Sequence, residues 1–185
     1  METRLVLAGI GGQGVVFATK VLSQAALARG ERVMASENHG MSQRGGSVQS
    51  HLKIGGSDSP LIRRGTADWL IAFDRVEAIR NLPFVRAGGH VAVNTPNGLE
   101  PSVERRLHEL EISLLTIDAD AYAKELGGPG MTNLVVLGLA AAHPAFGLSA
   151  NDIEAAVRAL GPARAVEVNL KALGMGSDVQ RMKAG

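Results

Sequence analysis

The sequence predicts an α/β protein, a three-layer sandwich around a largely parallel, Rossmann-like sheet. Two observations carry this prediction. Short apolar runs alternate with segments of helical periodicity, which implies right-handed crossovers between parallel strands. A glycine-rich stretch at 9–14 also lies between the first apolar run, 5–8, and a helix-period segment, as in dinucleotide-binding units. With 185 residues and a hydrophobic content of 45%, the chain should bury one core, so we predict a single domain over 1–185.

Six strands are predicted from short apolar or alternating runs. The run at 67–73 is continuously apolar, as in a strand buried on both faces, whereas 47–54 alternates and should have one solvated face that carries His51. Residues 61–64 could extend a hairpin before the fourth strand. The strands are expected at residues 5–8, 32–36, 47–54, 67–73, 90–94 and 112–117.

Helices are predicted where apolar residues recur three or four positions apart. Gly30 should end the first helix, Asp74 should cap the second, and Ser149 should open the sixth. We expect the last helix to be short and to be followed by a frayed polar tail from Gly174. The predicted helices occupy residues 15–29, 75–82, 103–110, 119–126, 134–142, 150–160 and 166–173.

The composition argues against several classes of function. Lysine and arginine number 19 against 18 acidic residues, and this net charge of +1 gives no electrostatic case for binding nucleic acid or an anionic membrane. The absence of cysteine rules out thiol catalysis and thiolate-held iron–sulfur clusters on this chain. The five histidines have no metal-ligand spacing. The apolar run 134–142 is shorter than the roughly 20 residues of a membrane span, and we see no secretory signal, so a cytoplasmic protein is expected.

The glycine turn is the first candidate for a binding site. Gly9, Gly11 and Gly14 match the dinucleotide-type spacing, in which glycine permits a tight turn and a close approach of the backbone to an anion. The turn could hold a ligand phosphate at the start of the first helix, form a purely structural crossover, or contact another subunit. Glu37, after the second strand, keeps open a nicotinamide reading in which an acid holds the ribose.

Segment 38–46 has the composition of a functional loop. It has no periodicity, contains three glycines, and gathers His39, Gln43 and Arg44 where the carboxyl end of the sheet should lie. Arg44, next to Gly45, could bind a phosphate or carboxylate through two hydrogen bonds, or could pair with an acid across a subunit interface.

A second glycine-rich loop, 127–130, precedes the apolar helix at 134–142. We expect Thr132 to be an ordinary N-cap of this helix. Asn133 would then lie at the helix entrance and contact either a ligand or a neighbouring loop. A Gly-x-Ser-x-Gly elbow and a phosphate loop with its Lys and hydroxyl pair are both absent from the sequence, so hydrolase and nucleoside triphosphatase readings have no starting point.

Three segments together are similar to the gamma-type subunit of thiamine-dependent 2-oxoacid:ferredoxin oxidoreductases. They are Gly-Ile-Gly-Gly-Gln-Gly-Val at 9–15, Glu-Asn-His-Gly-Met-Ser-Gln-Arg-Gly-Gly-Ser-Val at 37–48, and Thr-Asn-Leu-Val-Val-Leu-Gly at 132–138. The second segment most resembles the small (beta) subunit of the indolepyruvate enzymes. Phenylglyoxylate enzymes are close candidates, and pyruvate and 2-oxoglutarate enzymes are less similar in this loop.

The resemblance implies an accessory subunit of a complex that oxidatively decarboxylates a 2-oxoacid with coenzyme A, giving acyl-CoA, CO2 and reduced ferredoxin. Thiamine diphosphate, Mg2+ and [4Fe-4S] clusters are expected on partner subunits, and the thiamine-bearing partners are expected to be the main determinants of which 2-oxoacid side chain is accepted. We assign no catalytic residue and no metal ligand to this chain. The resemblance and the loop compositions mark binding or interface positions, where coenzyme A is one candidate ligand, at Gly9, Gly11, Gly12, Gln13, Gly14, Glu37, His39, Gln43, Arg44, Gly45, Thr132 and Asn133.

Two other functions stay open at this point. One is a free-standing nicotinamide-dependent dehydrogenase that uses the glycine turn and Glu37, and it would be expected to bind its cofactor alone. The other is a nucleotide-sensing or coenzyme A-sensing module without catalysis. A homodimer is expected for the isolated chain if surfaces meant for a partner stay exposed.

Overall fold

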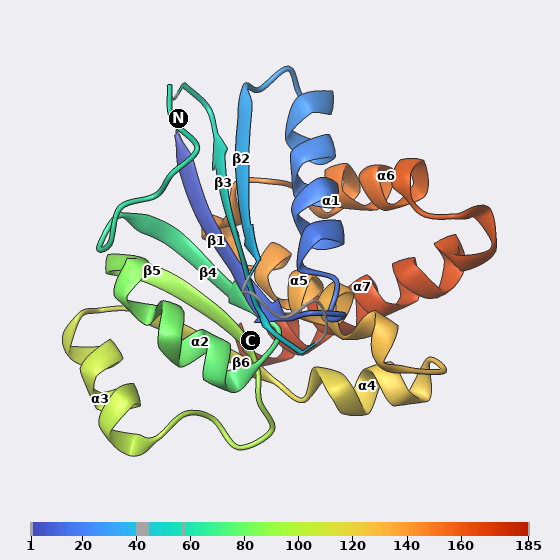
Figure 1. Cartoon of the computed structure of the whole chain (residues 1–185). Helices are drawn as coiled ribbons and strands as arrows, with labels where there is room; N and C mark the ends of the chain where they lie inside the picture. The colour runs from blue at the N-terminus through green and yellow to red at the C-terminus, as the bar shows by residue number, and fades with distance from the viewer. Residues whose placement is uncertain (1, 40–44, 57, 185) are drawn as a thin grey trace.

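The computed structural model describes residues 2–39, 45–56 and 58–184. Gln43 and Arg44 lie outside these ranges, and of His39 only the backbone is described. Figure 1 shows a central twisted sheet with helices on both faces. The strands are β1 (Thr3–Ile10), β2 (Val33–His39), β3 (Ser47–Ile54), β4 (Ala67–Ala72), β5 (Val85–Asn94) and β6 (Ser113–Ile117). The helices are α1 (Val15–Ala28), α2 (Arg75–Asn81), α3 (Pro101–Glu109), α4 (Ala119–Glu125), α5 (Thr132–Ala141), α6 (Ala150–Leu160) and α7 (Val166–Ala184).

The sheet confirms the predicted fold class. Its strand order is β2-β3-β1-β4-β5-β6, and β1, β4, β5 and β6 pair in parallel. Only β3 runs the other way, antiparallel to both β1 and β2. The carboxyl ends of the parallel strands therefore meet at one edge, where the turn after β1 lies.

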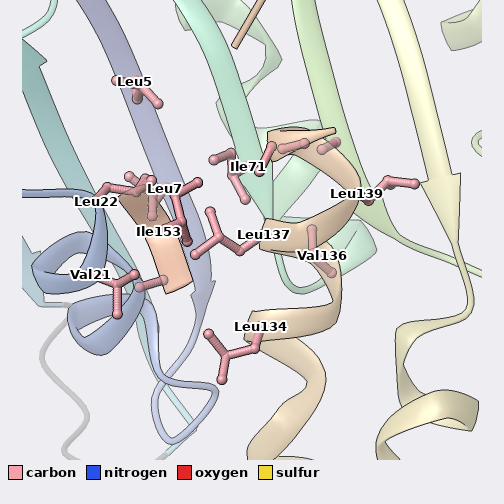
Figure 2. Packing of buried hydrophobic residues seen from close by; sticks show 14 of the residues in the cluster. Leu5, Leu7, Val21, Leu22, Ile71, Leu134, Val136, Leu137, Leu139 and Ile153 are labelled. Carbon is pink, nitrogen blue, oxygen red and sulfur yellow. The ribbon is translucent and has the colours of Figure 1, made fainter. Parts of the chain in front are cut away.

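The larger core fills the space between the sheet and the layer of α1, α5, α6 and α7. Figure 2 shows Leu7 of β1, Leu22 of α1, Leu137 of α5 and Ile153 of α6 gathered in this core. Every residue of α5 is buried, as expected of a helix that is apolar on all sides. On the opposite face a smaller core lies under α2 and α3, and alternate β1 residues supply it, with Val6 facing it.

The C-terminal helix differs from the prediction. Instead of fraying after Gly174, α7 continues to Ala184 and packs along α5. A Cβ at Gly138 or Gly176 would collide with backbone atoms of the facing helix, so these glycines allow the two helices to approach closely. Ser177 Oγ donates to the carbonyl of Gly138 or Leu173, both at 3.1 Å. Tertiary packing thus outweighs the low helix propensity of glycine here.

His51 also differs from the prediction, because it is buried rather than solvated. Its Nδ1 accepts a hydrogen bond from the Ile62 amide at 2.9 Å, and its ring lies edge-on to Phe84 at 5.2 Å. Residues 61–64 form no strand. Ile62 of this segment is buried beside His51, on the face of β3 that the alternation predicts to be solvated. Burial, with a smaller effect of Lys53, lowers the pKa of His51.

Candidate functional site

The glycine turn joins β1 to α1 in a conformation that only glycine adopts easily. Gly12 has φ of +102° and Gly14, the N-cap of α1, has φ of +78°. The Gly11 amide donates to the carbonyl of Gly46 at 2.8 Å. The turn is therefore tied to the residues that enter β3, which places Gly46 beside the glycine turn.

Gln13 is turned inward and fixes the turn. Its side-chain Oε1 accepts a hydrogen bond from the Ile10 backbone amide at 2.8 Å, and the backbone amide of Gln13 donates to the Ile10 carbonyl at 3.0 Å. A Cβ at Gly9 would lie 2.9 Å from this Oε1 and 3.0 Å from a Val15 methyl. A small residue at position 9 and an amide side chain at position 13 are thus parts of one packing arrangement.

Asn133, at the start of α5, supports the turn through a hydrogen bond to Gly14. Its Nδ2 donates to the Gly14 carbonyl at 3.2 Å, and its Oδ1 accepts from the Leu134 amide at 2.8 Å. A Cβ at Gly14 would collide with the Asn133 side-chain amide. Of the two alternatives predicted for Asn133, the structure therefore shows the contact with a neighbouring loop.

Thr132 is not the N-cap that the sequence predicts. The cap position of α5 is Met131, and Thr132 is the first helical residue, with its side chain buried. Thr132 Oγ1 donates to Asp120 Oδ1 of α4 at 2.8 Å. The hydroxyl thus joins α4 to α5. Thr132 lies inside the helix and not at its cap because the short helical turn at Pro129–Met131 directly precedes α5.

The outer side of the turn is exposed. Within the part of the chain that the structure describes, an added Cβ at Gly12 or Gly45 would meet no atom within 4 Å, and both glycines are exposed. The N-cap of α1 makes no side-chain hydrogen bond, and the first turn of this 14-residue helix contains no acidic residue. Free amide hydrogens and the positive end of the helix dipole make such an end compatible with an anion.

Glu37 is separated from the turn by a strand. It is exposed on β2, and β3 lies between β2 and β1. Two strand spacings amount to about 9–10 Å. An acid that holds a nicotinamide ribose normally follows the strand adjacent to β1, so this geometry does not favour the dehydrogenase reading.

A polar network that the sequence does not predict lies beside the turn. The Glu77 carboxylate of α2, whose side chain is only 3% exposed, accepts from Ser47 Oγ at 2.6 Å and pairs with Arg80. One turn later Gln49 donates to Asn81. These bonds hold the first residues of β3, which directly follow Gly46, against α2. Asp74 caps α2 as predicted, which places Glu77 in its first turn, but nothing in the sequence indicates that Ser47 lies nearby.

Across the described ranges, no group of three or more His, Cys, Asp or Glu side chains could hold a metal ion. The same residues contain no helix that is both long and apolar enough to span a bilayer.

Comparison with known proteins shows the family. The family model described as pyruvate ferredoxin/flavodoxin oxidoreductase matches residues 4–179. Indolepyruvate oxidoreductase subunit IorB is 33% identical in Archaeoglobus fulgidus and 36% identical in Pyrococcus horikoshii, with 95% of this chain and 94% of each relative covered. The solved gamma subunit of a keto/oxoacid ferredoxin oxidoreductase from Geobacter sulfurreducens has a TM-score of 0.78 at 26% identity, covering 97% of this chain and 99% of that one.

The matches extend along nearly the whole chain, and the range of the family model contains the residues of the glycine turn. The chain therefore belongs to the pyruvate ferredoxin/flavodoxin oxidoreductase family, as a gamma-type subunit of a 2-oxoacid:ferredoxin oxidoreductase complex.

Proposed function

We propose that this chain is the accessory subunit of an aryl-2-oxoacid:ferredoxin oxidoreductase, with indolepyruvate as the leading substrate and phenylglyoxylate as the alternative. The observation that carries the substrate is the similarity to indolepyruvate oxidoreductase subunits over 95% of the chain. The reaction joins the acyl group of the 2-oxoacid to the sulfur of coenzyme A, releases CO2, and passes the electron pair to oxidised ferredoxin.

The cofactors of this reaction belong, on this proposal, to partner subunits. Thiamine diphosphate with Mg2+ supplies the chemistry that cleaves the bond to the carboxylate, and [4Fe-4S] clusters carry the electrons. The chain contains no cysteine, so it has no thiolate with which to hold a cluster. A cytoplasmic location and a homodimer of the isolated chain stay predictions.

The role we assign to this chain is to bind a phosphate of coenzyme A at the start of α1. The open side of Gly12, the uncapped helix end and the inward-turned Gln13 leave backbone amides as the groups that face outward. Backbone amides at a helix start suit a phosphate group. Arg44, outside the described residues, is proposed to add a guanidinium contact from the neighbouring loop.

The test is steady-state kinetics of the intact complex with indolepyruvate, phenylglyoxylate and pyruvate, measured as ferredoxin reduction at varied coenzyme A. We expect the highest kcat/KM for an aryl substrate. Arg44→Ala should raise the KM for coenzyme A about tenfold, because one charge-assisted contact with coenzyme A is lost, while kcat changes little. Arg105→Ala, a matched change at an exposed arginine of α3, should leave both constants unchanged.

Two results would contradict this proposal. A preference for pyruvate would remove the aryl assignment, and equal coenzyme A constants for Arg44→Ala and Arg105→Ala would remove the coenzyme A contact. Binding of a nicotinamide cofactor by the isolated chain would instead favour the dehydrogenase reading.

A further inference from the structure

A basic pocket lies at the end of the sheet opposite to the glycine turn. Its volume is about 590 Å³, and its charged lining consists of Arg4, Lys53 and Arg63 with one carboxylate, Glu2. Arg4 is near the start of β1 and Lys53 near the end of β3, whereas the glycine turn follows the last residue of β1. Figure 1 shows the N-terminus and the start of α1 at opposite ends of the sheet. The pocket is therefore separate from the proposed coenzyme A contact.

Two of the cations face each other across a strand pair. Arg4 and Lys53 are directly opposite in the antiparallel register of β1 and β3, so their side chains share one face of the sheet. Like charges in this position are destabilising. Among the residues that line the pocket, three cations stand against one carboxylate, a lining excess of two positive charges. Arg4 Nε donates to that carboxylate, Glu2 Oε1, at 2.9 Å.

The third cation is carried by a backbone segment that is fixed on both sides. On one side the Ile62 amide donates to buried His51 at 2.9 Å, and Ile62 is 4% exposed. On the other side the Gly65 amide donates to the Pro83 carbonyl at 2.9 Å, and Thr66 Oγ1 donates to the Arg63 carbonyl at 2.8 Å. The Arg63 backbone is thus placed before any ligand arrives.

The Arg63 side chain is available to a ligand. Within the described ranges its guanidinium has no hydrogen-bond or ion-pair partner, and it is exposed at the pocket wall. A guanidinium presents a planar fork of donors that matches phosphate oxygens. The neighbouring Arg64 is also exposed but does not line the pocket.

We propose that this pocket binds the phosphate dianion of a small metabolite or of free inorganic phosphate. A dianion balances the excess of two positive charges, and a single carboxylate would balance only half of it. The volume falls within the roughly 300–1,000 Å³ of small-molecule sites, which leaves room for an organic group beside the phosphate. This inference does not depend on the proposed substrate or on the coenzyme A contact.

The test is a calorimetric titration of the full chain with inorganic phosphate and, separately, with glycerol 3-phosphate at constant ionic strength. We expect saturable binding, weakened about tenfold by Arg63→Gln or Lys53→Gln, as for the loss of one charge-assisted hydrogen bond. Arg64→Gln removes the same charge one residue away and should leave the affinity within about twofold of wild type. Tighter binding of glycerol 3-phosphate identifies a metabolite as the source, and equal binding identifies free phosphate.

Several outcomes would overturn the proposal. One is the absence of saturation up to about 10 mM of either probe, a range weaker than typical metabolite binding. Another is an equal loss for Arg63→Gln and Arg64→Gln, which would indicate diffuse attraction to a basic surface. A third is unchanged binding in both Arg63→Gln and Lys53→Gln, which would place the phosphate elsewhere, for example at α1. Thermal melts of each variant test whether the fold is retained, and Arg4 is left intact because its removal would unpair Glu2.

Discussion

The two ends of β1 use polar side chains in opposite ways. At its carboxyl end Gln13, Asn133 and Glu77 all bond to atoms of the protein itself, so among the described residues the groups left for a ligand are backbone amides. At its amino end the backbone around Arg63 is held by other residues, and cationic side chains face a hollow. A binding site that consists of backbone amides can thus carry few charged side chains, and a search for clusters of charged residues overlooks such a site.

The largest expected effect tests how tightly the glycine turn is enclosed. Gly14→Ala should lower the free energy of unfolding by about 2–4 kcal/mol, because a left-handed conformation and a collision with Asn133 add together. Gly30→Ala has the same φ of +78° in open space and should lose only about 1–2 kcal/mol. Urea denaturation measures both. Equal losses would mean that Asn133 moves aside freely.

The second effect concerns the polar network that holds β3. Glu77→Gln should cost about 1–3 kcal/mol, because the buried carboxylate accepts from Ser47 and pairs with Arg80. Glu109→Gln breaks a pair with Arg106 that is exposed on both sides and should change stability by less than about 0.5 kcal/mol. Denaturant melts of the two variants check this difference. A loss for Glu77→Gln no greater than that for Glu109→Gln would remove the network from the account.

The third effect separates a structural from a ligand-binding role of Gln13. Gln13→Ala removes the acceptor of the Ile10 amide and should cost about 1 kcal/mol, whereas Gln13→Glu keeps an acceptor and should cost less. Thermal unfolding of the isolated chain is the measurement. If neither variant changes stability, the side chain of Gln13 does not fix the turn, and a structural role of its inward orientation is contradicted.

The smallest effect concerns pH and the amino-terminal half of the sheet. Burial is the main cause that lowers the pKa of His51, His90 and His143, and neighbouring His143 adds to the effect on His90. These folded-state values lie below the unfolded value, so the unfolded chain binds more protons and stability falls as the pH drops below about 6.5. The loss is absent at higher pH, where all three are neutral in both states.

His90→Phe tests this prediction while preserving an aromatic ring against Trp69, on which His90 stacks at 4.5 Å. Denaturation midpoints at pH 7 and pH 5 should fall less in His90→Phe than in wild type. The exposed His108 of α3 provides the control, since His108→Gln should keep the wild-type pH dependence. A pH dependence that is unchanged in His90→Phe would show that His90 does not contribute.

Local patterns were sufficient for much of the fold. Alternating strand and helix periods predict the parallel units, and Asp74 and Ser149 cap α2 and α6 where short polar side chains precede apolar periodicity. The glycine spacing identifies the turn after β1. These features depend on neighbouring residues in the sequence, so one chain suffices to detect them.

Other features depend on contacts between distant segments. β3 pairs between β1 and β2, and no residue of β3 predicts this position in the sheet. His51 is buried because residues 61–64 cover it. The helix α7 continues past Gly174 because it packs closely against α5 at Gly138. The inward orientation of Asn133 and the Ser47–Glu77 bond bring together residues from different layers. Periodicity and spacing carry no information about such contacts.

The most direct test of the central claim is to isolate the complex from its native source through a tag on this chain and measure 2-oxoacid-dependent and coenzyme A-dependent ferredoxin reduction. We expect that a larger chain carrying thiamine diphosphate and iron–sulfur absorbance is recovered, that the complex turns over, and that the chain alone does not. A chain recovered alone and colourless, or an isolated chain that oxidises a 2-oxoacid by itself, would contradict the accessory role.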